Sequence, residues 1–166
     1  MSTKRLNSGF TLVEILIATG ILGFALCAIL ATYISCFSLI STTKNVNIGI
    51  NAEMGLMEQI RSTPFAQLSD DPPSFTINGA AFTLKSTDLY ECHFPLSVLP
   101  SGMAVVYINQ TNSELLNVTI SACWRQGLRI IGEDTNLNGV LNSGEDTNSN
   151  GMIDSPAQLV TRIANR

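Results

Sequence analysis

Positive charge and histidine are scarce in this 166-residue chain. It has 9 Lys and Arg against 13 Asp and Glu, a formal net charge of −4, and a single histidine. Nucleic-acid-binding domains carry clustered basic residues, so we expect no nucleic-acid partner. The histidine, His93, stands beside Cys92 in a predicted strand, and the Ser and Asp residues of the loops lack a partnered base. The sequence therefore predicts that the protein is not an enzyme.

Long polar stretches are missing from the N-terminal region. Residues 15–34 are almost wholly apolar, interrupted only by Thr19, Thr32 and two glycines. Twenty helical residues extend about 30 Å, which is enough to cross a membrane once. Lys4 and Arg5 precede this run. By the positive-inside tendency the N-terminus stays in the cytoplasm and the chain after Lys44 lies outside the inner membrane.

One carboxylate stands at the start of the apolar run. Glu14 ends the string GFTLVE, which begins at Gly9 and follows Lys4 and Arg5. An acidic side chain within a membrane is costly, so it indicates a function. The string resembles the signal of type IV pilins and type II secretion pseudopilins.

The resemblance implies a processing site and an assembly contact. A membrane prepilin peptidase and methyltransferase would cut between Gly9 and Phe10 and methylate the new N-terminus. Glu14 would then be the fifth mature residue and would pair with the Phe10 amine of a neighbouring subunit. The expected divisions are a leader (1–9), a transmembrane and filament-core helix (10–43) and an outside globular domain (44–166).

Two other targeting signals fit the N-terminal sequence less well. A secretory signal has a basic start and an apolar core, but a carboxylate opening that core does not fit. Lipoprotein anchoring at Cys27 would require a better residue before it than Leu26. Both interpretations are less consistent with the sequence than the pilin resemblance.

The outside region predicts one helix and several strands. Apolar residues recur at a helical period between Asn45 and Arg61, and Thr63-Pro64 should end that helix. Asn78-Gly79 predicts a hairpin turn. The fold class is thus α+β, a pilin fold in which a long N-terminal membrane helix packs on an antiparallel sheet. Strands are expected at 75–77, 81–84, 89–95, 103–108, 115–125, 128–131 and 159–164.

Four cysteines fall into two pairs. Cys27 and Cys36 lie in the apolar helix, where they are expected to be small packing residues. Cys92 and Cys123 lie in predicted strands of the outside domain, where an oxidising compartment favours a disulfide. Buried free thiols are the alternative, because the sequence does not fix the Cα separation.

A twelve-residue repeat occupies residues 132–155, GEDTNLNGVLNS followed by GEDTNSNGMIDS. Its first copy matches the calcium-loop pattern D-x-[DN]-x-[DN]-G-x5-E, in which alternating oxygens surround a hard cation. Residues 130–160 contain five acidic residues and no basic one. An Asn- and Gly-rich polar turn is the alternative. The predicted ligands of this calcium ion are Asp134, Asn136, Asn138, the Val140 carbonyl, Asn142 and Glu145.

The second copy is a weaker match because its twelfth position is Ala157. It either shares ligands with the first loop or binds nothing. No helical pattern flanks the loops, so they resemble the tandem calcium loops of dockerin or thrombospondin type 3 repeats rather than EF-hands. A second calcium ion would be bound by Asp146, Asn148, Asn150, the Met152 carbonyl and Asp154.

The segment Ala52–Phe65 is similar to the region after the anchor in PilV-type minor pilins and GspI-type minor pseudopilins. The resemblance implies that a strand near 117–124 pairs with the last one, with the calcium loops inserted before it. We expect a minor pilin of a type IV pilus, whose partners are other pilins and, before assembly, the inner membrane. Alternatives are a type II secretion pseudopilin, a major pilin, or a membrane-tethered calcium-dependent adhesion module that does not polymerise.

Overall fold

The computed structural model describes residues 10–112 and 114–165. Contacts divide the chain into two units, with the boundary between Ser41 and Thr42. Helix α1 (Leu12–Ser62) runs through both, so its residues 12–41 and 42–62 are considered separately.

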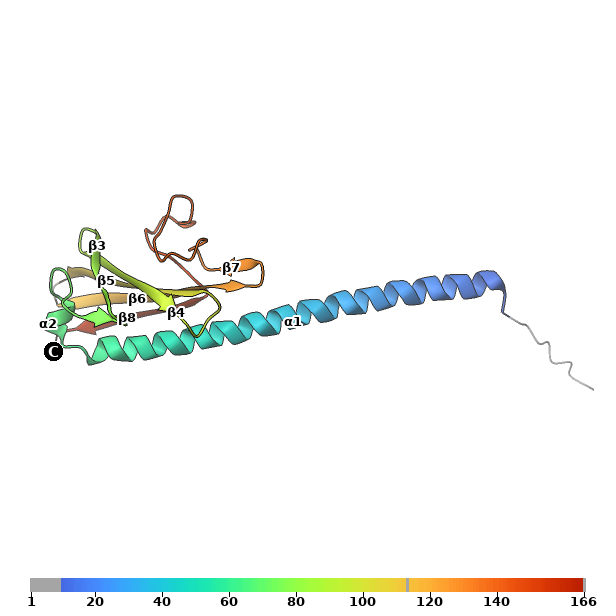
Figure 1. Cartoon of the computed structure of the whole chain (residues 1–166), viewed down its shortest axis with the longest axis horizontal. Coiled ribbons are helices and arrows are strands. Elements are labelled where there is room, and N and C mark those ends of the chain that lie inside the picture. The colour runs from blue at the N-terminus through green and yellow to red at the C-terminus, as the bar shows by residue number, and fades with distance from the viewer. Residues whose placement is uncertain (1–9, 113, 166) are drawn as a thin grey trace, which may run out of the picture. The chain divides into compact units, whose positions relative to one another are not determined.

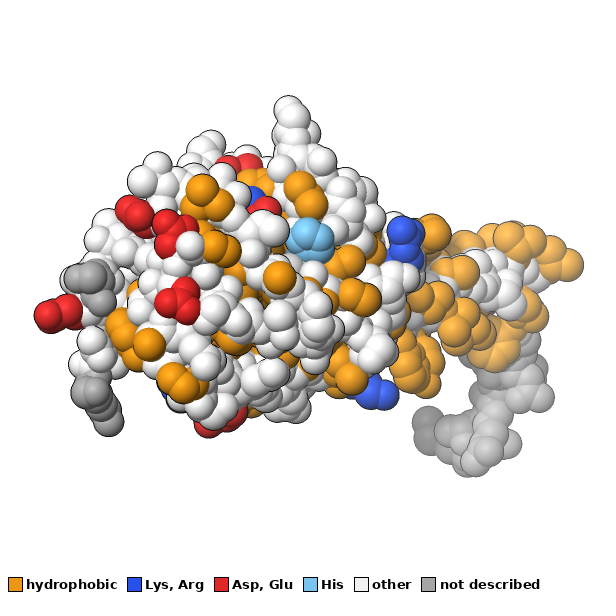
Figure 2. Space-filling model, turned by 60° about the vertical axis from the view of Figure 1, so that its left-hand side comes forward, with side chains coloured by type: hydrophobic (Ala, Val, Ile, Leu, Met, Phe, Trp, Pro, Cys, Tyr) orange, Lys and Arg blue, Asp and Glu red, His pale blue; other side chains and the backbone are white. Residues whose placement is uncertain are grey.

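The first part of α1 is exposed and apolar. Its most apolar 18-residue window has a mean hydropathy of 2.4, and none of that window is buried. Figure 2 shows apolar side chains along this helix. Length and composition therefore allow it to cross a membrane. Glycines at 20 and 23 have open space around them and do not interrupt the helix.

The second unit consists of the end of α1 and an antiparallel sheet (Figure 1). The helix ends at Ser62, one residue before the Thr63-Pro64 step, so the predicted helix stop is confirmed. A single turn, α2 (Phe65–Leu68), follows. The strands are β1 (Thr76–Ile77), β2 (Ala80–Ala81), β3 (Thr83–Ser86), β4 (Leu89–Leu96), β5 (Gly102–Asn112), β6 (Leu115–Gln126), β7 (Arg129–Ile131) and β8 (Ala157–Ala164).

The sheet has the order β3-β4-β5-β6-β7, and β8 also pairs with β6. The pairing of β6 with the last strand runs from Leu115 opposite Ala164 to Ala122 opposite Ala157, so that expectation is confirmed. Strands β1 and β2 form a separate hairpin around Asn78 and Gly79, which have φ values of 50° and 81°. These positive values match the predicted Asn-Gly turn. The α+β fold class is confirmed.

Both faces of the sheet are buried. Alternate residues of β4, β5 and β6, such as Phe94, Val106 and Ile120, join Leu56 and Ile60 of α1 in the main core. The residues between them face the other way. Val105, Tyr107 and Cys123 form a second, smaller core with Ile153 from the segment between β7 and β8.

A carboxylate lies within the main helix–sheet interface. Glu53 of α1 is fully buried, and neither of its side-chain oxygens has a hydrogen-bond partner. Burial raises the pKa of Glu53 to about 8, and the backbone of Ala122, close but outside hydrogen-bond geometry, offsets part of that shift. Glu53 is therefore neutral in the folded protein at pH 7 and ionised in the unfolded chain.

Because the folded state holds a proton that the unfolded chain releases, stability should fall as pH rises from about 5 to about 8. We expect a loss on the order of 2–4 kcal/mol for the full chain in detergent micelles. Guanidinium unfolding followed by fluorescence of the single, buried Trp124 measures it. In Glu53→Gln the decline should vanish, whereas Glu58→Gln on the exposed side of the helix should retain it. An unchanged slope in Glu53→Gln would contradict the assignment.

Candidate functional site

The N-terminal end of α1 is closed by a reciprocal cap. The backbone N–H of Glu14 donates to Thr11 Oγ1 at 3.2 Å, and the N–H and hydroxyl of Thr11 each donate to Glu14 Oε2 at 3.4 Å. This is the arrangement of a Thr-x-x-Glu capping box. The cap gives Glu14 a local role in starting the helix. The Thr11-Glu14 spacing indicates this role, but it was not among the sequence-based predictions.

The expected cleavage site falls at the edge of this region. Gly9 lies outside the described residues. Phe10 precedes the helix and is 82% exposed. The cap therefore places the Glu14 carboxylate in the first turn, four residues after Phe10, where the helix dipole favours negative charge.

The repeat segment covers the outer face of the sheet, opposite α1 (Figure 1). It lies between β7 and β8 and contains no helix or strand. Ile153 is fully buried, and its N–H donates to Tyr107 Oη of β5 at 3.0 Å. Burying such a side chain contributes about 1.5–3 kcal/mol. Leu137, Leu141 and Met152 pack beside it.

Two glycines let the segment approach the sheet closely. A Cβ at Gly139 would lie 2.6 Å from Cβ of His93 on β4, and one at Gly132 would lie 2.2 Å from Sγ of Cys123 on β6. Gly139 also has a φ of 77°, which favours glycine. The glycine of the motif thus has two roles, turning the loop and leaving room for His93. That histidine is exposed, as Figure 2 shows.

The first loop is organised by Asp134 and Glu145. Asp134 Oδ1 accepts from the N–H of Asn138 at 3.1 Å, and its Oδ2 accepts from the N–H of Gly139 at 2.7 Å. Glu145 closes the loop by accepting from the backbone N–H of Thr135 and of Asn142, both at 2.9 Å. The first and twelfth positions of the motif therefore hold the loop together.

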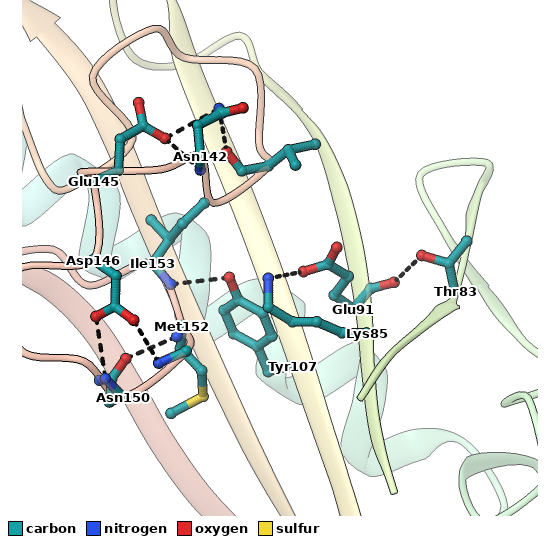
Figure 3. Close-up of polar contacts among 12 residues, drawn as sticks. Thr83, Lys85, Glu91, Tyr107, Asn142, Glu145, Asp146, Asn150, Met152 and Ile153 are labelled. Carbon is teal, nitrogen blue, oxygen red and sulfur yellow. Dashed lines mark hydrogen bonds and ion pairs between the residues drawn. The ribbon is translucent and has the colours of Figure 1, made fainter. Parts of the chain in front are cut away.

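Oxygen atoms of three further motif positions converge on the Asn142 side chain. Its Nδ2 lies 3.4 Å from Asn138 Oδ1 and 2.8 Å from the Val140 carbonyl oxygen. It also lies 3.1 Å from Glu145 Oε2 (Figure 3). These are positions 5, 7 and 12 around position 9. Asn136, at position 3, turns its Oδ1 to the N–H of Asn138 at 3.0 Å. The oxygens are of the kind that calcium prefers.

The carboxylates of the first loop are buried without a basic partner. Asp134 is 0% exposed and Glu145 is 5% exposed. Among the residues that the structure describes, the ion pairs are Arg61 with Glu58 and Lys85 with Glu91. Burial raises the pKa of Glu145, but hydrogen bonds from Thr135 and Asn142 outweigh it and lower the pKa to about 2. Glu145 is thus held ionised, which suits a cation ligand.

The second loop repeats this geometry in a more exposed place. Asp146 Oδ1 accepts from the N–H of Asn150 at 3.1 Å, and its Oδ2 accepts from the N–H of Gly151 at 2.9 Å (Figure 3). Asp154 Oδ2 lies 2.5 Å from Asn148 Nδ2 and 2.8 Å from Asn150 Nδ2. Hydrogen bonds thus connect the residues at positions 1, 3, 5 and 9 of the second loop. The Met152 N–H donates to Asn150 Oδ1 at 2.7 Å.

One acidic residue that the motif search did not include contacts the second loop. Glu133 Oε1 accepts from the N–H of Thr147 at 3.1 Å, and its Oε2 accepts from the N–H of Asp154 at 3.1 Å. Within residues 10–112 and 114–165, no three side chains of His, Cys, Asp or Glu gather as a ready metal site. A site here would rely on amide and carbonyl oxygens as well.

Comparison with known proteins supports the N-terminal motif. Residues 4–32 match the family described as "Prokaryotic N-terminal methylation motif". That motif is the signature of type IV pilins and pseudopilins, and it indicates a structural subunit that is processed by a peptidase and assembles with other pilins. No curated protein and no solved structure matches the chain.

The expected disulfide between Cys92 and Cys123 is not formed; both are free, buried thiols. Cys92 lies opposite Val106 and Cys123 opposite Met103 on β5, which separates their strands. Cys92 belongs to the main core and Cys123 to the second core, so their side chains point to opposite faces. Two strand spacings amount to about 9–10 Å, beyond the Cα separation that a disulfide spans.

Burial raises the pKa of both thiols to about 11, so neither should react with iodoacetamide in the native protein. Once the chain is unfolded with iodoacetamide present and without reductant, peptide mass spectrometry should find both modified. Cys27 and Cys36 of the apolar helix, labelled in the same unfolded sample, serve as internal controls for complete modification. Recovery of a linked Cys92–Cys123 peptide would refute the observed strand register.

Proposed function

We propose that the protein is a minor pilin of a type IV pilus, processed by prepilin peptidase and assembled within the filament or at its tip. The observation that carries this proposal is the methylation motif at residues 4–32 leading into α1, whose first 30 residues are exposed. Such a surface suits a membrane first and the helices of other subunits later. The same motif serves type II secretion pseudopilins, which are the second candidate.

Glu14 is the proposed assembly contact. Once the chain is cut before Phe10, the new amine and the carboxylate lie at the same end of α1. An unpaired carboxylate among packed apolar helices would cost several kcal/mol. Pairing Glu14 with the Phe10 amine of the neighbouring subunit offsets that cost and fixes how the helices are staggered.

The repeat segment is proposed to bind calcium outside the cytoplasm. Support comes from the motif, from the oxygens that converge on Asn142 and from the two buried carboxylates without a basic partner. The first loop offers only Asp134 and Glu145 as anionic ligands, so its affinity should be modest, on the order of 10⁻⁴ M as in extracellular modules. The bound ion would hold the segment against Tyr107 and Cys123.

The processing step is tested at the N-terminus of the protein expressed with its peptidase. Mass spectrometry should find a mature chain that begins with N-methylated Phe10. Gly9→Val should impair cleavage, because the resemblance implies a cut after glycine and a branched side chain there would crowd the cleavage site. An intact Met1, or a start at a lipidated Cys27, would refute the pilin proposal and favour a tethered module.

Calcium binding is tested by thermal unfolding of the full chain in detergent, with calcium or with chelator. At about ten times the Kd, calcium should stabilise the folded state by roughly 1.4 kcal/mol per site. Glu145→Gln should remove the contribution of the first loop. Ser143→Ala, an exposed non-ligand change in the same loop, should leave it intact. Identical melting temperatures for the parent in both conditions would contradict calcium binding, and the segment would then be an ordinary polar loop.

A further inference from the structure

Glu133 stands one residue before the first calcium motif, yet its contacts are with the second loop. Its Oε1 accepts hydrogen bonds from both the backbone N–H and the hydroxyl of Thr147. Its Oε2 accepts from the N–H of Asp154. Thr147 and Asp154 are positions 2 and 9 of the loop that starts at Asp146.

Glu145 makes the corresponding three contacts in the first loop, and its Oε2 also accepts from Asn142 Nδ2 at 3.1 Å. Its Oε1 accepts from the N–H of Thr135 at 2.9 Å and from the Thr135 hydroxyl at 2.5 Å, and its Oε2 accepts from the N–H of Asn142. Thr135 and Asn142 are positions 2 and 9 of the loop that starts at Asp134. Two glutamates twelve residues apart thus have matching environments, each in a different loop.

The sequence repeat explains this correspondence. Each copy begins Gly-Glu-Asp-Thr-Asn, so Glu133 precedes Asp134 as Glu145 precedes Asp146. Glu145 comes at the end of the first loop and can close it directly. Ala157, the residue at the twelfth position of the second loop, starts β8 and is buried opposite Ala122. A closing carboxylate for the second loop would therefore have to come from elsewhere in the fold.

We propose that Glu133 is the twelfth-position calcium ligand of the second loop, so that the repeat forms two calcium sites, each closed by the glutamate of one copy. The inference rests on the proposed calcium function. The second ligand set is then Asp146, Asn148, Asn150, the Met152 carbonyl, Asp154 and Glu133.

On this assignment the second site is no longer the weaker of the two, as the linear motif indicates it to be. The second site has three carboxylates, from Glu133, Asp146 and Asp154, whereas the first has two, from Asp134 and Glu145. More anionic ligands raise calcium affinity, so the second site binds at least as tightly as the first. Since Glu133 and Asp134 are adjacent in the chain, filling one site also positions a ligand of the other, and binding is positively cooperative.

Isothermal titration calorimetry tests the assignment. Calcium chloride is titrated into the full chain in detergent micelles, and the number of bound ions and their affinities are measured. The parent should bind two ions. Glu133→Gln and Glu145→Gln should each bind one, and the double variant should bind none. Glu114→Gln, an exposed glutamate in the turn between β5 and β6, should still bind two.

Binding of two ions by Glu133→Gln at the parent's affinities would overturn the assignment, as would a parent that binds only one. A parent that binds none would instead refute the proposed calcium function. Where Glu133→Gln fails to fold, Glu133→Asp retains the charge with a shorter reach. It should weaken the second site at least tenfold while leaving the first near its parent affinity, and unchanged binding at both would again overturn the assignment.

Discussion

The fold of the second unit depends on one constraint: its sheet is apolar on both faces. In strand β5 consecutive residues such as Val106 and Tyr107 enter different cores. Leaving either core open to water would cost about 25 cal/mol for each Å² of apolar surface. The end of α1 covers one face. The single turn α2 places Leu68 in the same main core, and the repeat segment between β7 and β8 covers the other face.

A loop can serve as such a cover only if its own backbone groups are satisfied. Here acidic and amide side chains accept the hydrogen bonds that a helix or strand would make internally. Asp134 and Asp146 each accept from two backbone N–H groups of their own loop. Ile153 then fills the second core, with its N–H bonded to Tyr107. The calcium motif therefore doubles as the framework that presents an apolar side chain to the sheet.

Much of this fold is predictable from local patterns. The end of α1 follows from Thr63-Pro64, and the β1–β2 hairpin follows from Asn78-Gly79. The error at Cys92 and Cys123 has a specific cause. Shifting a strand by one residue exchanges its two faces, and the register is set by packing that the linear sequence does not display. Their partners, Val106 and Met103, are an odd number of residues apart on β5 and so face opposite ways.

The candidate site also has a part that local sequence patterns predict and a part that they do not. Residues within each loop, such as Asp134 and Asn138, follow from the spacing of the motif, whereas the contact of Glu133 with the second loop spans the two copies. The calcium-loop motif covers only the residues of one loop, and in the second loop its twelfth position is Ala157. The repeat itself carried a signal, because a glutamate precedes each initial aspartate, but only the folded chain shows which loop each glutamate reaches.

The negative charge of the repeat segment makes its docking on the sheet depend on the ions around it. Five carboxylates and no basic residue lie between residues 130 and 160, and the cover lies over an apolar core. Mutual repulsion among these groups opposes docking, and salt alone screens buried groups such as Asp134 poorly. On the proposed function, a divalent cation within each loop would neutralise this repulsion between carboxylates. On the proposed function, calcium outside the cell would thus determine how firmly the outer face of the sheet is closed, while α1 and the main core need no ion.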